Sequence, residues 1–171
     1  MRSTEREITN IDEIDSLLGR AQVCRLALRD GEYPYIVPLC FGYSLDGGEL
    51  ELYFRSEEKG KKIDLLKQCS SAAFEIDELC GVVRSDDPYG FDARYLSITG
   101  TGTVEFITGI DKITGFGLIL KKYAGFPADR KLHEQTLNSF AVLKLTAAEF
   151  CCKEHDPTIS TGPTISTVPR D

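Results

Sequence analysis

The chain has 171 residues, 42% of them hydrophobic and 27% charged, which is typical of one globular domain that buries a core without metal or disulfide support. Its net charge of −7, from 20 Lys and Arg against 27 Asp and Glu, disfavours general binding to nucleic acid or to anionic membranes. No apolar run reaches the length of a membrane span, and the acidic N-terminal segment lacks a signal core, so we expect a cytoplasmic protein.

The first half of the sequence predicts one amphipathic helix followed by three strands joined by tight turns. Thr9 or Asn10 can cap the helix and Gly19 can end it. Pro34 and Pro38 remove two hydrogen-bond donors from the second strand, which places them at an edge, at a bulge or at a gap that faces a ligand. The predicted elements are a helix over 9–19 and strands over 22–28, 33–45 and 49–54, with turns at 29–31 and 45–48.

The second half predicts two more helices and three more strands. Gly100 and Gly102 allow strong bending or close backbone approach within a long strand. The pentapeptide PTIST occurs twice near the end of the chain, where nothing can pack a core. We therefore expect one domain over 1–154 and a disordered tail over 155–171. The remaining predictions are helices over 61–69 and 109–125, strands over 72–79, 93–107 and 139–150, and loops over 81–92 and 125–138.

Six strands interrupted by helices predict a mainly β fold, an antiparallel barrel with helical covers, because the first turns are too short for parallel crossovers. The six cysteines include no CxxC pair and are expected to be reduced packing residues. Cys151, Cys152 and His155 are the residue types that hold a metal, but adjacent cysteines chelate poorly and no fourth ligand is evident near them, so no metal is predicted.

The segment "YFRSEEKGKKIDLLKQC", residues 53–69, concentrates five basic side chains at a predicted junction between a strand and a helix. One interpretation is a solvated helix face, since lysines are usually exposed and nearby acids neutralise them. The other is an anion site, because Lys61 and Lys62 fall in the first helical turns, where free N–H groups already favour negative charge. No Walker loop and no GxGxxG after a strand occurs, so the pattern does not name the anion.

Three segments, "CRLALRDGEYPYIVPLCFGY", "LYFRSEEKGKKID" and "YLSITGTGTVEF", together resemble the FMN-binding split-barrel family related to pyridoxamine 5′-phosphate oxidase. The nearer resemblance is to the branch that contains the nitroimidazole-resistance reductases. The resemblance implies a six-stranded antiparallel split β-barrel that forms a homodimer with two FMN molecules at the subunit interface.

The resemblance also implies which residues hold FMN. The phosphate falls to Arg55, Ser56, Lys61 and Lys62. The residues implied for the isoalloxazine ring are Val37, Pro38, Leu39 and Cys40, with Ser97 of the partner chain and Tyr95 on the same face.

Two departures limit what the family implies. Arg55 stands where nitroimidazole-resistance proteins typically have His, and Leu96 where they often have Arg, so nitro-drug reduction is not expected. The substrate-phosphate arginines of the oxidases have no counterparts near the C-terminus, so vitamin B6 synthesis is not expected either.

The function expected from the sequence is that of an FMN-dependent oxidoreductase acting on an unidentified small molecule, with NADH or NADPH as reductant. Catalytic residues are not assigned; His133 is a weak candidate and Tyr123 is expected in the core. The alternatives are a non-catalytic flavin carrier or redox sensor, and a barrel that binds haem or a deazaflavin.

Overall fold

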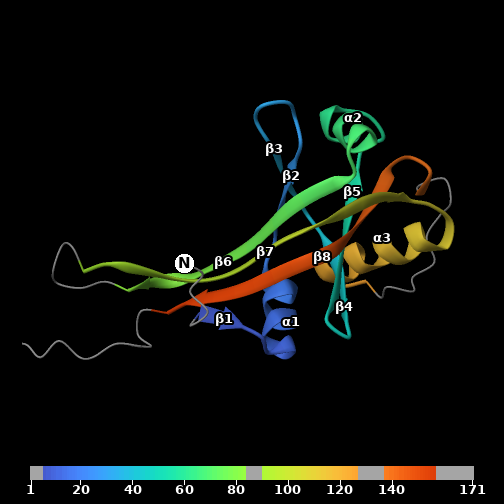
Figure 1. Ribbon diagram of the computed structural model, residues 1–171. Helices are drawn as coiled ribbons and strands as arrows, with labels where there is room; N and C mark the ends of the chain where they lie inside the picture. Colours follow the sequence, from blue (N-terminus) through green and yellow to red (C-terminus); the bar gives the residue numbers. More distant parts are fainter. Residues whose placement is uncertain (1–5, 84–89, 127–136, 157–171) are drawn as a thin grey trace, which may run out of the picture.

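The computed structural model describes residues 6–83, 90–126 and 137–156. Within them, one antiparallel sheet is accompanied by three helices (Figure 1). The helices are α1 (Ile11–Arg20), α2 (Lys61–Gln68) and α3 (Gly109–Ala124). The strands are β1 (Glu7–Ile8), β2 (Cys24–Leu28), β3 (Tyr35–Leu39), β4 (Gly42–Asp46), β5 (Glu49–Ser56), β6 (Ser71–Val83), β7 (Asp92–Ile107) and β8 (Ala141–His155).

The strand order brings both edges of the sheet together. It runs β3-β2-β6-β7-β8-β5-β4, with the short β1 paired to β8, so β3 and β4 form the two edges although they follow each other in the chain. Only Cys40 and Phe41 connect them, which keeps the Cα atoms of Leu39 and Gly42 within about 11 Å of each other. The sheet therefore curls into a barrel that is split between β3 and β4.

The predicted fold class, a mainly β antiparallel split barrel, is confirmed, although the described residues form eight strands instead of six. One extra strand is β1, and the other arises because the expected strand over 33–45 is two strands. The chain leaves one edge after Leu39 and joins the other at Gly42. β3 is an edge strand, one of the three positions expected for Pro38, and within the described residues Pro38 pairs only with Arg25 of β2.

Several predicted boundaries were wrong. Gly19 was expected to end the first helix but lies inside α1, which ends at Arg20. Asn10 does cap the helix, since its side chain accepts a hydrogen bond from the Asp12 N–H. The paired strands β6 and β7 reach further into the expected loop, and β8 continues to His155; they run on as a long extension beyond the rest of the sheet (Figure 1).

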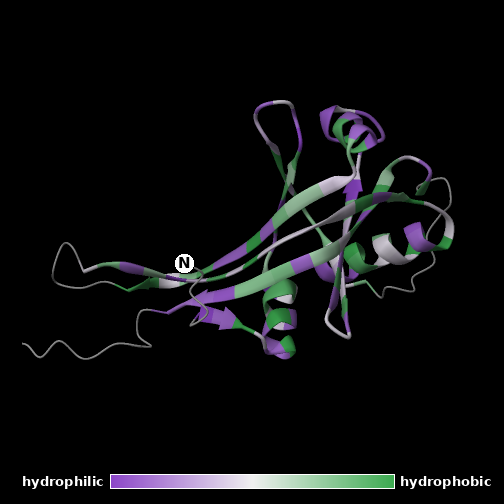
Figure 2. Cartoon of the chain, in the orientation of Figure 1, coloured by the Kyte–Doolittle hydropathy of each residue, from purple (hydrophilic) through white to green (hydrophobic). Residues whose placement is uncertain are grey.

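Two hydrophobic clusters stabilise this arrangement. The larger one fills the barrel and includes Leu17 and Leu18 of α1, Ile63 of α2, and Leu26 and Leu52 of the sheet. The smaller cluster lies between α3 and the strands β5, β7 and β8. Hydrophobic residues accordingly recur along α1 and the long strands, whereas α2 presents hydrophilic residues around its outside (Figure 2). No helix in the described ranges combines the length and the apolar character needed to cross a membrane.

The close backbone approach predicted at Gly100 and Gly102 is confirmed. A Cβ atom at Gly100 would lie 2.5 Å from the Glu149 carbonyl oxygen and from the Phe74 ring. A Cβ atom at Gly102 would lie 2.3 Å from the Thr146 carbonyl oxygen. Any side chain at these two positions would push β7 away from β8, so the sequence needs glycine there.

Candidate functional site

The basic segment lies where β5 ends and α2 begins. Gly60 precedes α2 with a φ of 120°, a conformation that favours glycine, and none of the described side chains caps the helix. Lys61 and Lys62 are the first two residues of α2, next to amide groups that lack an acceptor within the helix. The start of α2 therefore presents both charged side chains and polarised N–H groups.

The two lysines differ in how far they are neutralised. Lys61 forms an ion pair with Asp30 at 2.5 Å and lies 5.1 Å from the centre of the Tyr35 ring. Lys62 is half-buried and has no ion pair in the described part of the chain; burial lowers its pKa, and the more distant Glu57 opposes that shift. An anion beside Lys62 would compensate this cost of burial, so Lys62 is the strongest anion-binding candidate here.

Arg55 and Ser56, also predicted for the phosphate, lie on opposite faces of β5. Ser56 is only 6% exposed, and its hydroxyl donates to the Glu57 carbonyl. The Arg55 guanidinium lies 4.7 Å from the centre of the Phe140 ring, on the side covered by α3. The structure therefore brings Ser56 and the lysines to one end of the barrel, whereas Arg55 faces another direction.

Lys112 is a residue that sequence reasoning missed. Its ammonium donates to the Phe140 carbonyl at 2.6 Å and lies 5.3 Å from the centre of the same ring that Arg55 covers. Two cations thus share one aromatic side chain at this end of α3. No spacing signal indicates this, because Lys112 and Arg55 come from separate elements.

The residues predicted for the flavin ring lie on both faces of β3. Val37 and Leu39 are half-buried and pack against the barrel core. Pro38 and Cys40 are exposed on the other side. A planar ligand along this edge would therefore contact Pro38 and Cys40.

Tyr95 and Ser97 lie further away, on the long β7 strand. Tyr95 is 38% exposed and packs against His155, with the ring centres 5.4 Å apart. Ser97 pairs with Asp77 of β6 and Lys153 of β8. Neither belongs to the site around α2 within one chain. Their predicted role as contacts to a flavin held mainly by a second copy stays a prediction.

An open groove of about 530 Å³ lies between the β2–β3 hairpin and the strands β6 and β7. Its floor is made largely of small side chains, and Arg29 is the one charged residue among those that line it. The lining residues are Ala27, Leu28, Arg29, Pro34, Ser71, Ala72, Ala73, Thr101, Gly102, Thr103 and Ala148.

The candidate metal ligands do not form a cluster. Cys151 and Cys152 are consecutive in β8, so their side chains point to opposite faces, and only Cys152 is buried. His155 instead forms a 2.9 Å hydrogen bond from Nε2 to the Asp92 carboxylate. No metal-binding group occurs in the ranges that the structure describes. His133 and the PTIST repeats lie outside those ranges.

A sequence model of the family described as pyridoxamine 5′-phosphate oxidase matches residues 10–154. The chain therefore belongs to this family, as the sequence resemblance indicated. No curated protein matches it.

Solved structures share the fold at low sequence identity. A Bacteroides thetaiotaomicron protein, described as a candidate for 5-nitroimidazole antibiotic resistance, is 24% identical with a TM-score of 0.73, covering 86% of each chain. The FAD and heme binding protein of Mycobacterium smegmatis is 23% identical with a TM-score of 0.70, over 88% of this chain and 74% of that one. The flavocytochrome Anf3 of Azotobacter vinelandii is 18% identical with a TM-score of 0.67, over 91% and 72% respectively.

Proposed function

We propose that the protein is a flavin-binding oxidoreductase that holds FMN at the start of α2. The observation that carries this proposal is Lys62, a half-buried cation without an ion pair in the described residues, at the uncapped start of a helix. Membership of the pyridoxamine 5′-phosphate oxidase family and the flavin named for two of the similar structures support it.

In this proposal the phosphate of FMN is bound by Lys61, Lys62 and the first amide groups of α2, close to Ser56. Lys61 would share its charge between Asp30 and the phosphate. Arg55 would reach the flavin from the opposite face of β5. The ring would lie along β3, where Pro38 offers no N–H to a neighbouring strand and Cys40 is exposed.

Bound FMN would supply hydride and single-electron transfer, and the residues of the chain would bind and orient it. We further propose that the protein acts as a homodimer on a small molecule, with NADH or NADPH as reductant. Tyr95 and Ser97 would then face the flavin of the partner. The cytoplasmic location expected from the sequence stays a prediction.

The second candidate is a non-catalytic flavin carrier or redox sensor. Arg55 favours it, because its guanidinium is held against Phe140 at the position where the resembling reductases have His. Such a protein would retain flavin tightly and react slowly with every reductant. A third candidate is a barrel that binds haem or a deazaflavin. In that case Lys61 and Lys62 would not bind the phosphate of FMN.

The test is an absorption spectrum of the purified protein, followed by release and mass identification of the chromophore. We expect flavin bands and FMN, bleached by NADH or NADPH. Tight FMN with slow, unselective reduction would favour the carrier, and a protein that neither carries nor takes up FMN would overturn the proposal.

A further inference from the structure

The end of α3 contacts the short link between β3 and β4. The Phe41 N–H donates to the Tyr123 hydroxyl oxygen at 3.1 Å, and that hydroxyl donates in turn to the Gln22 carbonyl at 2.6 Å. Gln22 lies just before β2, which is the one strand that pairs with β3 in the described part of the chain. A single hydroxyl group therefore joins α3, the β3–β4 link and the approach to β2.

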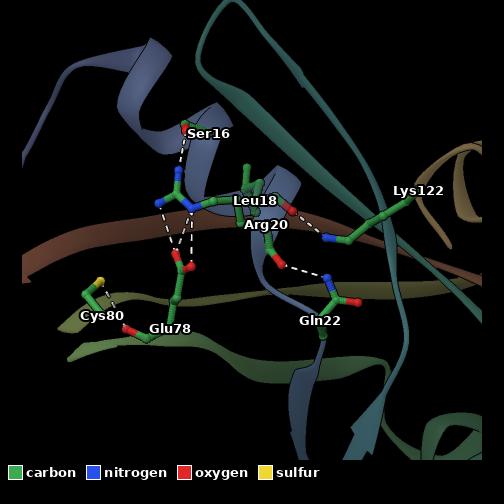
Figure 3. Close-up of polar contacts among 7 residues, drawn as sticks. All are labelled: Ser16, Leu18, Arg20, Gln22, Glu78, Cys80 and Lys122. Carbon is green, nitrogen blue, oxygen red and sulfur yellow. Dashed lines mark hydrogen bonds and ion pairs between the residues drawn. The ribbon is translucent and has the colours of Figure 1, made fainter.

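Lys122, the preceding residue, adds a second connection. Its ammonium lies 3.6 Å from the centre of the Phe41 ring and donates to the Leu18 carbonyl near the end of α1. Figure 3 shows this contact beside the Arg20 side chain, which binds Glu78 of β6. The end of α1 is thus held to α3 on one side and to β6 on the other.

The backbone of α3 also lies unusually close to the link. A Cβ atom at Gly42 would come within 2.6 Å of the Ile119 nitrogen and 2.8 Å of the Leu118 carbonyl carbon. Because Gly42 has no side chain, α3 can approach near enough for Tyr123 to reach Phe41. The contact is therefore a feature of packing and hydrogen bonding together.

The link needs such support because it crosses the open side of the barrel. Among the described residues β3 has a neighbouring strand only on its β2 side, and the link itself belongs to no strand. Burial raises the pKa of the Tyr123 hydroxyl to about 12, and its electrostatic interaction with Cys40, at the end of the predicted ring-binding stretch, acts in the same direction. Movement of Phe41 would move Cys40 and Pro38 with it.

We propose that Tyr123 is a positioning residue that holds the β3–β4 link across the split of the barrel, and so orients Pro38 and Cys40 toward the flavin ring. This inference rests on the proposed function for the identity of the ligand. It assigns Tyr123, expected from the sequence to be a core residue, a hydrogen-bonding role at the edge of the site; its side chain is 37% exposed.

The test compares Tyr123→Phe with Tyr43→Phe, a matched control whose hydroxyl donates to Asp15 of α1 and not to a group that holds the link. Affinities for FMN and riboflavin are measured by flavin fluorescence, together with the visible circular dichroism of the bound ring. We expect Tyr123→Phe to bind both flavins about tenfold more weakly and to alter the dichroism, since one hydrogen bond accepted from Phe41 and one donated to Gln22 are lost. Tyr43→Phe should change neither affinity by more than about twofold.

Amide hydrogen exchange at Phe41, followed by NMR, provides the readout that does not depend on a flavin. Exchange at Phe41 should accelerate in Tyr123→Phe but not in Tyr43→Phe. If Tyr123→Phe folds poorly, the unmodified protein still provides a test, because bound flavin should slow exchange at Phe41. Unchanged exchange, or equal flavin affinity and dichroism in all three proteins, would overturn the positioning role alone. An unmodified protein that binds no flavin would overturn the proposed function and, with it, the orientation of a ring by Tyr123.

Discussion

Arg55 and Ser56 are adjacent in the chain but serve different faces of β5. Ser56 is buried at the end of the barrel, whereas the Arg55 guanidinium stacks on Phe140 beneath α3. A phosphate bound near Ser56 and α2 would therefore lie on the opposite face of β5 from the Arg55 guanidinium. This separation gives the first prediction.

Replacing Arg55 with Gln should change the affinities for FMN and riboflavin by similar factors, so that their ratio shifts by less than about twofold. The physical reason is that Arg55 points away from Ser56 and contacts an aromatic ring instead. Equilibrium titration with both flavins measures the ratio. A loss confined to FMN would show that Arg55 binds the phosphate directly.

The double variant Lys61→Gln, Lys62→Gln should behave in the opposite way. Each charge-assisted hydrogen bond contributes about 1.5–3 kcal/mol, so loss of two should weaken FMN binding by about a hundredfold or more, while riboflavin, which has no phosphate, binds almost as before. The control is Lys67→Gln, which removes an exposed charge from the last turn of the same helix. Equal weakening of both flavins would contradict the phosphate assignment.

Gly42→Ala should destabilise the fold by about 1–3 kcal/mol, because the added methyl group would overlap the α3 backbone at Ile119. The matched control is Gly19→Ala, whose Cβ atom would lie 3.6 Å from the nearest atom, the Tyr43 hydroxyl oxygen. Since Gly19 is inside α1, its replacement should be neutral or stabilising by up to about 1 kcal/mol. Urea unfolding measures the stability of both variants. Similar stabilities would show that α3 shifts to accommodate the methyl group at little cost.

Stability should depend on pH in the alkaline range through the buried Cys24 thiol. Burial raises the pKa of Cys24 from 9.0 to about 12, so the unfolded chain loses this proton near pH 9 while the folded protein keeps it. The contribution is therefore complete below pH 9 and is lost as the pH rises from 9 toward 12, by at most about 1.4 kcal/mol per pH unit.

Comparison with Cys24→Val removes this contribution and retains the groups of opposite sign. Lys122 is one of them. Burial lowers its pKa from 10.5 to about 8, so its contribution to the stability of the fold increases as the pH rises from 8 to 10.5. Urea midpoints of both proteins, measured under reducing conditions from pH 8 to 11, should diverge above pH 9, with the unmodified protein losing more stability. Parallel curves would show that the thiol ionises as readily in the folded state as in the unfolded chain.

Local sequence patterns predicted most of the elements. Asn10 caps α1 because its short polar side chain can accept an N–H at a helix start, and Ile14, Leu17 and Leu18 recur at the helical period and are buried. Gly100 and Gly102 predicted the close approach of two strands. The break between β3 and β4 at Cys40 and Phe41 was missed because the alternation of exposed and buried residues continues through it from β3. No local pattern shows that the chain passes there from one edge of the sheet to the other.

Local patterns were enough to predict the mainly β character and the basic start of α2, because propensity, periodicity and local charge act over a few neighbouring residues. The resemblance of three segments to known proteins indicated the family. Tertiary structure decided which of these residues meet. It separated Arg55 from Ser56, placed Lys112 beside Phe140 and brought Tyr123 to Phe41. Such contacts depend on how the sheet curls and where α3 packs, and residues far apart in the chain carry no local signal of that geometry.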